Sequence, residues 1–179
     1  MGLWSGWCIP WAAMIQNRLG NAEAAELLLD IWKREYNNGG GGSLHDAYFQ
    51  GMSLMANHPQ VMQMDGAMGA LTAVQDMLLH SRQGVLHLFA GSPLRHRKVS
   101  FTSMPAPGGF RVSASRTSTE ANVEVVAERE NTLRIKCHGN GFSQVTANGQ
   151  PVTLDTTGIL QRHMKAGETL RLHFFQHCG

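Results

Sequence analysis

The spacing of apolar residues changes near residue 82 of this 179-residue chain, and that change limits the folds open to it. Before residue 82, apolar side chains recur every three to four positions, which is the period of a helix with one buried face. After it, short runs rich in Val and Thr alternate with turn residues, which is typical of strands. We therefore predict an α+β chain with a helical part over residues 1–82 and a β part over residues 83–179.

Three helices are expected in the first part. The second begins after Asn21, a residue type favoured at helix N-termini, and ends before the four glycines at 39–42. The third begins about Gly66 and ends near His80, and its expected apolar face comprises Ala67, Leu71, Val74 and Leu78. The first helix contains three indoles that at helical spacing are more often core than a surface for stacking sugars, namely Trp4, Trp7 and Trp11.

Seven short strands are expected in the second part, separated by turn signals such as Asn148-Gly149. This number and spacing predict an antiparallel β-sandwich. Because the strands show no cluster of acids or histidines along the sequence, we expect the sandwich to support the fold rather than to carry a site. The predicted strands are 85–89, 98–102, 109–115, 123–128, 133–137, 159–164 and 168–174.

Composition excludes several classes of function. Charged residues make up 16% of the chain and its net charge is +2, which argues against nucleic acid as a partner. The longest apolar runs, such as 85–90, fall far short of a membrane helix, so no membrane partner is predicted. Three cysteines without a CxxC spacing indicate neither a disulfide framework nor a structural zinc site, and we predict no metal and no cofactor.

The long segment 43–65 is the first place to look for a site, because long loops in compact domains are usually functional. It ends on Asp65, directly before the third predicted helix. An aspartate at that position is a standard N-cap, but a carboxylate held at a helix start can also face a cavity, and the two roles are compatible. His58 is either an ordinary loop histidine or a ligand contact.

Several motifs then occur in a distinctive order. They are Trp4-Ser5, Arg18-Leu19-Gly20-Asn21, His58-Pro59, Gln63-Met64-Asp65-Gly66, Met77-Leu78-Leu79-His80-Ser81, Val85-Leu86-His87-Leu88 and Gly108-Gly109-Phe110. Over most of the chain, this order resembles the C-terminal end of the glycoside hydrolase family 95 α-L-fucosidases. The sequence departs from the family pattern in having Ala67-Met68 where Asn-Phe is usual, and in having one extra residue between His58 and Asp65.

The resemblance implies a fold, an activity and two site residues. Residues 1–82 would supply the last helices and the active-site loop of an (α/α)6 catalytic barrel, and residues 83–179 the β-sandwich that follows it. Such enzymes hydrolyse α-linked L-fucose with inversion, so the implied partner is a fucosylated oligosaccharide. Asp65 would correspond to the carboxylate that activates water, and His58 to a histidine that contacts the sugar. The family also suggests a secreted or periplasmic location.

The rest of that catalytic machinery does not have a counterpart in the sequence. None of the thirteen acidic residues corresponds to the family's general-acid glutamate, and its paired asparagines are also absent. A twelve-helix barrel needs on the order of 200 residues at typical helix and loop lengths. We therefore expect this chain to be part of a longer enzyme whose upstream barrel half is missing here. The alternative is a non-catalytic, carbohydrate-associated or scaffold module derived from such an enzyme.

Overall fold

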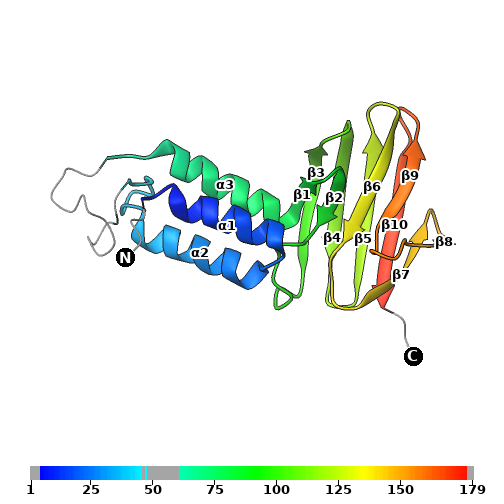
Figure 1. The fold of residues 1–179 in the computed structure, drawn as a ribbon, viewed down its shortest axis with the longest axis horizontal. Helices are drawn as coiled ribbons and strands as arrows, with labels where there is room; N and C mark the ends of the chain where they lie inside the picture. Colours follow the sequence, from blue (N-terminus) through cyan, green and yellow to red (C-terminus); the bar gives the residue numbers. More distant parts are fainter. Residues whose placement is uncertain (1–4, 46, 48–60, 177–179) are drawn as a thin grey trace. The chain divides into compact units, whose positions relative to one another are not determined.

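The computed structural model describes residues 5–45, 47 and 61–176. The chain divides into two compact units, Met1–Asp76 and Met77–Gly179. The first is helical and the second is built of strands, as Figure 1 shows by the order of its colours. The described residues therefore form an α+β fold, as predicted. The third helix itself contains the division between the units.

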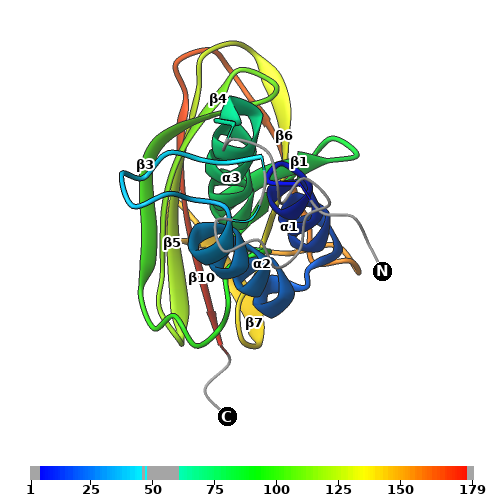
Figure 2. The same ribbon diagram turned by 90° about the vertical axis from the view of Figure 1, so that its left-hand side faces the viewer.

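The first unit contains α1 (Cys8–Leu19), α2 (Ala22–Glu35) and most of α3 (Met64–Leu78). Gly20 ends α1 with a φ of 79°, a left-handed conformation that glycine adopts without strain, and its N–H bonds back to the carbonyl of Asn17. Only two residues join α1 to α2, so the two helices pack as antiparallel neighbours. Figure 2, which looks along the helices, shows all three side by side.

Small residues bring α3 close to α1. The side-chain amide of Asn17 donates to the Ala73 carbonyl over 2.7 Å, and Arg18 pairs with Asp76 over 3.2 Å. Ala70 and Ala73 are buried on this face of α3. At its other end the unit has a small core in which Leu28 and Trp32 of α2 pack against three buried residues, namely Ile9, Tyr36 and Ala47.

The faces of α1 and α3 that the sequence indicated as buried are largely exposed. Trp11 is 53% exposed, and Leu71 and Val74 of α3 are 56% and 47% exposed. The spacing correctly predicted that each helix has an apolar face, but the small residues on another side of α3 make the contact with α1. Two continuous lines of exposed apolar side chains result. We call them the α1 stripe (Trp7, Trp11, Ile15 and Leu19) and the α3 stripe (Met64, Met68, Leu71 and Val74).

Within its described residues, the second unit contains ten strands rather than the seven expected. They are β1 (Leu79–Arg82), β2 (Val85–Leu88), β3 (Val99–Ala106), β4 (Phe110–Arg116), β5 (Glu120–Ala127), β6 (Asn131–Cys137), β7 (Phe142–Ala147), β8 (Gln150–Val152), β9 (Leu160–Met164) and β10 (Thr169–Gln176). The third helix ends at Leu78, so His80 lies in β1 and not at a helix end. Gln83 and Gly84, both with positive φ, make the tight turn that pairs β1 with β2.

The strands form a six-stranded sheet in the order β3-β4-β5-β10-β7-β8 and a four-stranded sheet in the order β1-β2-β6-β9. The larger sheet is antiparallel throughout. The smaller one departs from the prediction because β2 and β6 run parallel. Parallel neighbours need a long crossover connection. Here the connection from β2 to β6 contains β3, β4 and β5, which belong to the other sheet. One apolar core contains buried residues of both sheets, including Leu88, Leu133, Val112, Val125 and Leu172.

Candidate functional site

Asp65 lies in the first turn of α3 and is exposed. The helix begins at Met64, so the structure places Asp65 one residue inside the helix rather than before it as an N-cap. Its carboxylate oxygen Oδ1 accepts a hydrogen bond from the N–H of Gly66 over 3.0 Å. A negative side chain in the first turn also stabilises the helix through the helix dipole.

A short two-stranded ladder holds the start of α3. The N–H of Gln63 donates to the Ser43 carbonyl over 2.9 Å, and the Ser43 hydroxyl donates to the Gln63 carbonyl over 2.6 Å. The ladder is tied to the helices because Leu44 bonds to the carbonyl of Tyr36, at the end of α2, over 2.8 Å. The ladder therefore holds the backbone directly before Asp65, and α3 holds the backbone after it.

Glycines let this ladder and α3 approach the start of α1. A Cβ on Gly6 would lie 2.0 Å from the Leu44 carbonyl oxygen, and a Cβ on Gly66 would lie 3.2 Å from the Gly6 carbonyl oxygen. A Cβ on Gly69 would lie 3.2 Å from Pro10. The glycines after Asp65 thus serve helix packing.

Two buried polar atoms beside the start of α3 have no hydrogen-bond partner within the described residues. They are the side-chain amide oxygen Oε1 of Gln63 and the indole nitrogen Nε1 of Trp32. Trp32 Nε1 lies 3.5 Å from the Cβ position of Gly66, the residue after Asp65. Buried polar atoms are nearly always paired, so an unpaired acceptor and donor at this place are notable. Sequence reasoning gave Gln63 a place in a motif but no task, and it missed Trp32.

The second predicted site residue, His58, lies outside the described residues. The described residues near Asp65 are Gln63, Ser43 and Gly66. The sugar contact expected of His58 stays a prediction. No group of three His, Cys, Asp or Glu side chains within the described parts of the chain is arranged to hold a metal ion. In those same parts, no helix is both long and apolar enough to cross a membrane.

The exposed indoles of Trp7 and Trp11 stack on each other, with ring centroids 5.4 Å apart. They begin the α1 stripe, which continues to Leu19 along the whole helix. A platform for one sugar ring would need only the first part of that line. The stripe is more typical of a helix face that packs against another helix.

Three histidines form a second titratable cluster, which the sequence did not reveal. The rings of His80 and His87 stack with centroids 5.2 Å apart, and His87 Nδ1 lies 3.0 Å from His138 Nε2. Burial, together with the positive charge of neighbouring His80, lowers the pKa of His87 to about 4. Burial and the charge of His87 lower the pKa of His138 to about 4 as well. At neutral pH the pair is therefore uncharged, with one ring donating to the other.

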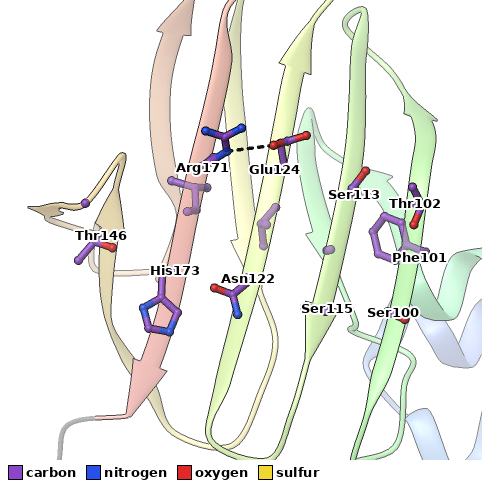
Figure 3. Close-up of a pocket in the computed structure, with 14 residues that line it drawn as sticks. Ser100, Phe101, Thr102, Ser113, Ser115, Asn122, Glu124, Thr146, Arg171 and His173 are labelled. Atoms are coloured by element: carbon purple, nitrogen blue, oxygen red, sulfur yellow. Dashed lines mark hydrogen bonds and ion pairs between the residues drawn. The ribbon is translucent and has the colours of Figure 1, made fainter.

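Polar residues from neighbouring strands also meet on the outer face of the six-stranded sheet (Figure 3). One row crosses five strands through directly paired residues, namely Ser100, Ser115, Asn122, His173 and Thr146. Each strand shows the alternation that places these residues on one face. The sequence could not reveal the cluster, because it comes from a strand order in which β10 lies between β5 and β7.

Comparisons with known proteins give no family and only distant likenesses. No family model matches the chain, and no curated protein matches it. Solved structures similar to it include a glycoside hydrolase family 127 β-L-arabinofuranosidase from Geobacillus stearothermophilus, with 14% identity over 91% of this chain and a TM-score of 0.40. A family 30 endoxylanase from Clostridium papyrosolvens has 14% identity over 46% of the chain and a TM-score of 0.33.

A family 44 xyloglucanase from Paenibacillus polymyxa has 10% identity over 38% of the chain and a TM-score of 0.32. These structural neighbours are all glycoside hydrolases. The chain spans 30% of the length of the arabinofuranosidase, 24% of the endoxylanase and 17% of the xyloglucanase. At TM-scores of 0.40 and below, none of these likenesses assigns a fold or an activity to this chain.

Proposed function

We propose that this chain is the C-terminal part of an inverting glycoside hydrolase that acts on α-L-fucosides of glycans, with Asp65 as the carboxylate that activates water. Residues 1–82 would belong to the catalytic helical barrel and residues 83–179 to the sandwich behind it. His58 would contact the sugar. No cofactor is needed for this chemistry.

The observation that carries the proposal is the placement of Asp65. Its side chain is exposed, and its backbone is held by the ladder and by the glycine contact between α3 and α1. A general base must present its carboxylate to water in a fixed position, and a side chain on a supported helix start meets that need. The Gln63 side-chain oxygen and the Trp32 indole nitrogen, which have no partner among the described residues, add an acceptor and a donor near the same helix start.

The rest of the mechanism follows from the chemistry of inversion. Asp65 would take a proton from a water molecule while that water attacks the anomeric carbon from the face opposite the leaving group. A second carboxyl group, about 6.5–9.5 Å away, must protonate the leaving oxygen. We place that acid in the upstream part of the longer protein. The exposed α1 and α3 stripes support this arrangement, because barrel helices pack against neighbours on both sides.

The second candidate is a non-catalytic module that binds carbohydrate or serves as a scaffold. The observation that favours it is that no acidic residue of this chain matches the family's general acid. The two candidates differ in what the longer protein does to a fucosylated glycan, because the module would bind it without cleaving it.

The test is to follow 2′-fucosyllactose by proton NMR in the presence of the longer protein that contains this chain. The proposal predicts release of L-fucose, with the β anomer appearing first because the α linkage is inverted. Initial release of the α anomer would contradict the inverting mechanism. An intact substrate after prolonged incubation would overturn the enzyme assignment in favour of the module.

A further inference from the structure

We propose that the outer face of the six-stranded sheet binds a neutral oligosaccharide, in the concavity around Asn122, Arg171 and His173 (Figure 3). This site belongs to the second unit alone, so it is independent of the role proposed for Asp65. It would hold a glycan without cleaving it.

The shape of the face suits a short chain of sugars. The concavity has a volume of about 800 Å³, within the range of roughly 300–1,000 Å³ that is usual for ligand sites. The polar row from Ser100 to Thr146 crosses five strands, and at about 4.8 Å between neighbouring strands it extends for roughly 19 Å. Strands hold their side chains more rigidly than loops do, which reduces the entropy lost on binding.

The hydrogen-bonding groups of this row are available to a ligand. Within the described residues, the side chains of Asn122, Ser115 and Thr146 make no hydrogen bond. An amide offers both donors and an acceptor, and a hydroxyl can act as either, so the row matches sugar hydroxyls, which also do both. In Figure 3, Asn122 and His173 extend from adjacent strands over the same part of the face.

The charges on this face are paired, which favours a neutral ligand over an anion. Arg171 donates through Nε to Glu124 over 3.0 Å, and His173 Nε2 lies 2.9 Å from Glu120 Oε2. The terminal nitrogens of Arg171 make no further hydrogen bond within the described chain, so they can donate to a sugar. The rings of His173 and Phe175 stack with centroids 5.0 Å apart, and this contact helps to hold the His173 imidazole beside the concavity.

The test is frontal affinity chromatography on the immobilised 179-residue chain with four neutral probes, namely maltohexaose, cellohexaose, xylohexaose and 2′-fucosyllactose. At least one probe should be retarded. For that probe, Asn122→Ala and Arg171→Ala should each weaken binding about tenfold, because each removes a hydrogen-bonding partner. Both residues are exposed, so circular dichroism should show an unchanged fold.

The matched control is Arg111→Ala. Arg111 lies on the same face of the same sheet and pairs with Glu128 over 2.6 Å, but it does not line the concavity. Its loss should leave binding unchanged. The proposal is overturned if none of the four probes is retarded, if Arg111→Ala weakens binding as much as Arg171→Ala, or if heparin is retained and the neutral probes are not.

Discussion

At the residue scale, the second unit buries an arginine, Arg116, that has no acidic partner within the described residues. The side chain is fully buried, its nitrogens donate to the Ser92 and Pro93 carbonyls over 3.2 and 3.0 Å, and its guanidinium lies 5.4 Å from the centre of the Phe89 ring. Burial lowers the pKa of Arg116. The arginine thus fixes the segment after β2 to the inner face of β4.

Replacing this arginine should destabilise the fold. We expect Arg116→Ala to lower the free energy of unfolding by about 3 kcal/mol, because buried carbonyls lose their donors and a cavity remains. Arg97→Ala is the control, because Arg97 is exposed and makes no contact of this kind in the described chain. Urea unfolding measures both variants, and equal stabilities would show that the buried contacts contribute nothing.

The histidine pair makes stability depend on pH. The pKa values of His87 and His138 fall from 6.5 in the unfolded chain to about 4 in the folded one, so the unfolded chain binds more protons between these values. The contribution of this pair to stability should therefore be constant above about pH 6.5 and fall as the pH drops toward 4, by at most about 1.4 kcal/mol per pH unit for each histidine.

Urea unfolding across this pH range checks the expectation, with His138→Gln as the comparison. The variant removes one of the two groups, so its stability should depend less steeply on pH. An identical slope in the two proteins would show that the pair does not titrate as described.

At the element scale, the sequence predicted the elements better than their contacts. Asn21 correctly predicted the start of α2, and alternation located seven of the ten described strands. It missed β7, although Val145 and Ala147 of that strand lie in the main core. The spacing could not tell which side of α3 meets α1, because the large residues Leu71 and Val74 dominate the apolar pattern, whereas the smaller Gly69, Ala70 and Ala73 allow the closest approach. β1 was missed because Leu79 continues the apolar period of α3 before the turn at Gln83-Gly84.

In the candidate sites, too, the sequence predicted single residues but not the contacts between them. A motif located Asp65 within one residue of its place at the start of α3. The residues around it, Ser43 and Trp32, come from distant parts of the chain, and only the fold brings them there. The row on the six-stranded sheet depends on strand order and register, which alternation alone does not determine.

Replacing Gly6 tests whether its close approach to Leu44 stabilises the start of α3. A Cβ there would lie 2.0 Å from the Leu44 carbonyl oxygen, which is backbone and cannot move without breaking the ladder. We expect Gly6→Ala to lower the free energy of unfolding by about 2 kcal/mol or more. Gly39→Ala is the matched control, because nothing lies within 4 Å of its Cβ position. Thermal unfolding compares the two, and the contact is refuted if both variants unfold at the same temperature.

At the scale of the whole molecule, the α1 and α3 stripes leave apolar surface that further helices would cover. Large exposed apolar patches usually mark interaction surfaces. We expect the 179-residue chain on its own to self-associate in sedimentation velocity experiments. Ile15→Lys should reduce the association, because Ile15 lies within the α1 stripe, whereas Leu94→Lys, at an exposed residue outside both stripes, should not. A monodisperse monomer would argue against covering helices.

The most direct test of the proposed function is the turnover of 2′-fucosyllactose by the longer protein with Asp65→Asn and, as the control, Asp30→Asn. Both changes remove the charge of an exposed aspartate on a helix, but only Asp65 is proposed to activate water. We predict that Asp65→Asn lowers kcat by about 100- to 10,000-fold with an unchanged fold, while Asp30→Asn keeps the original kcat. A near-normal kcat for Asp65→Asn would contradict the account.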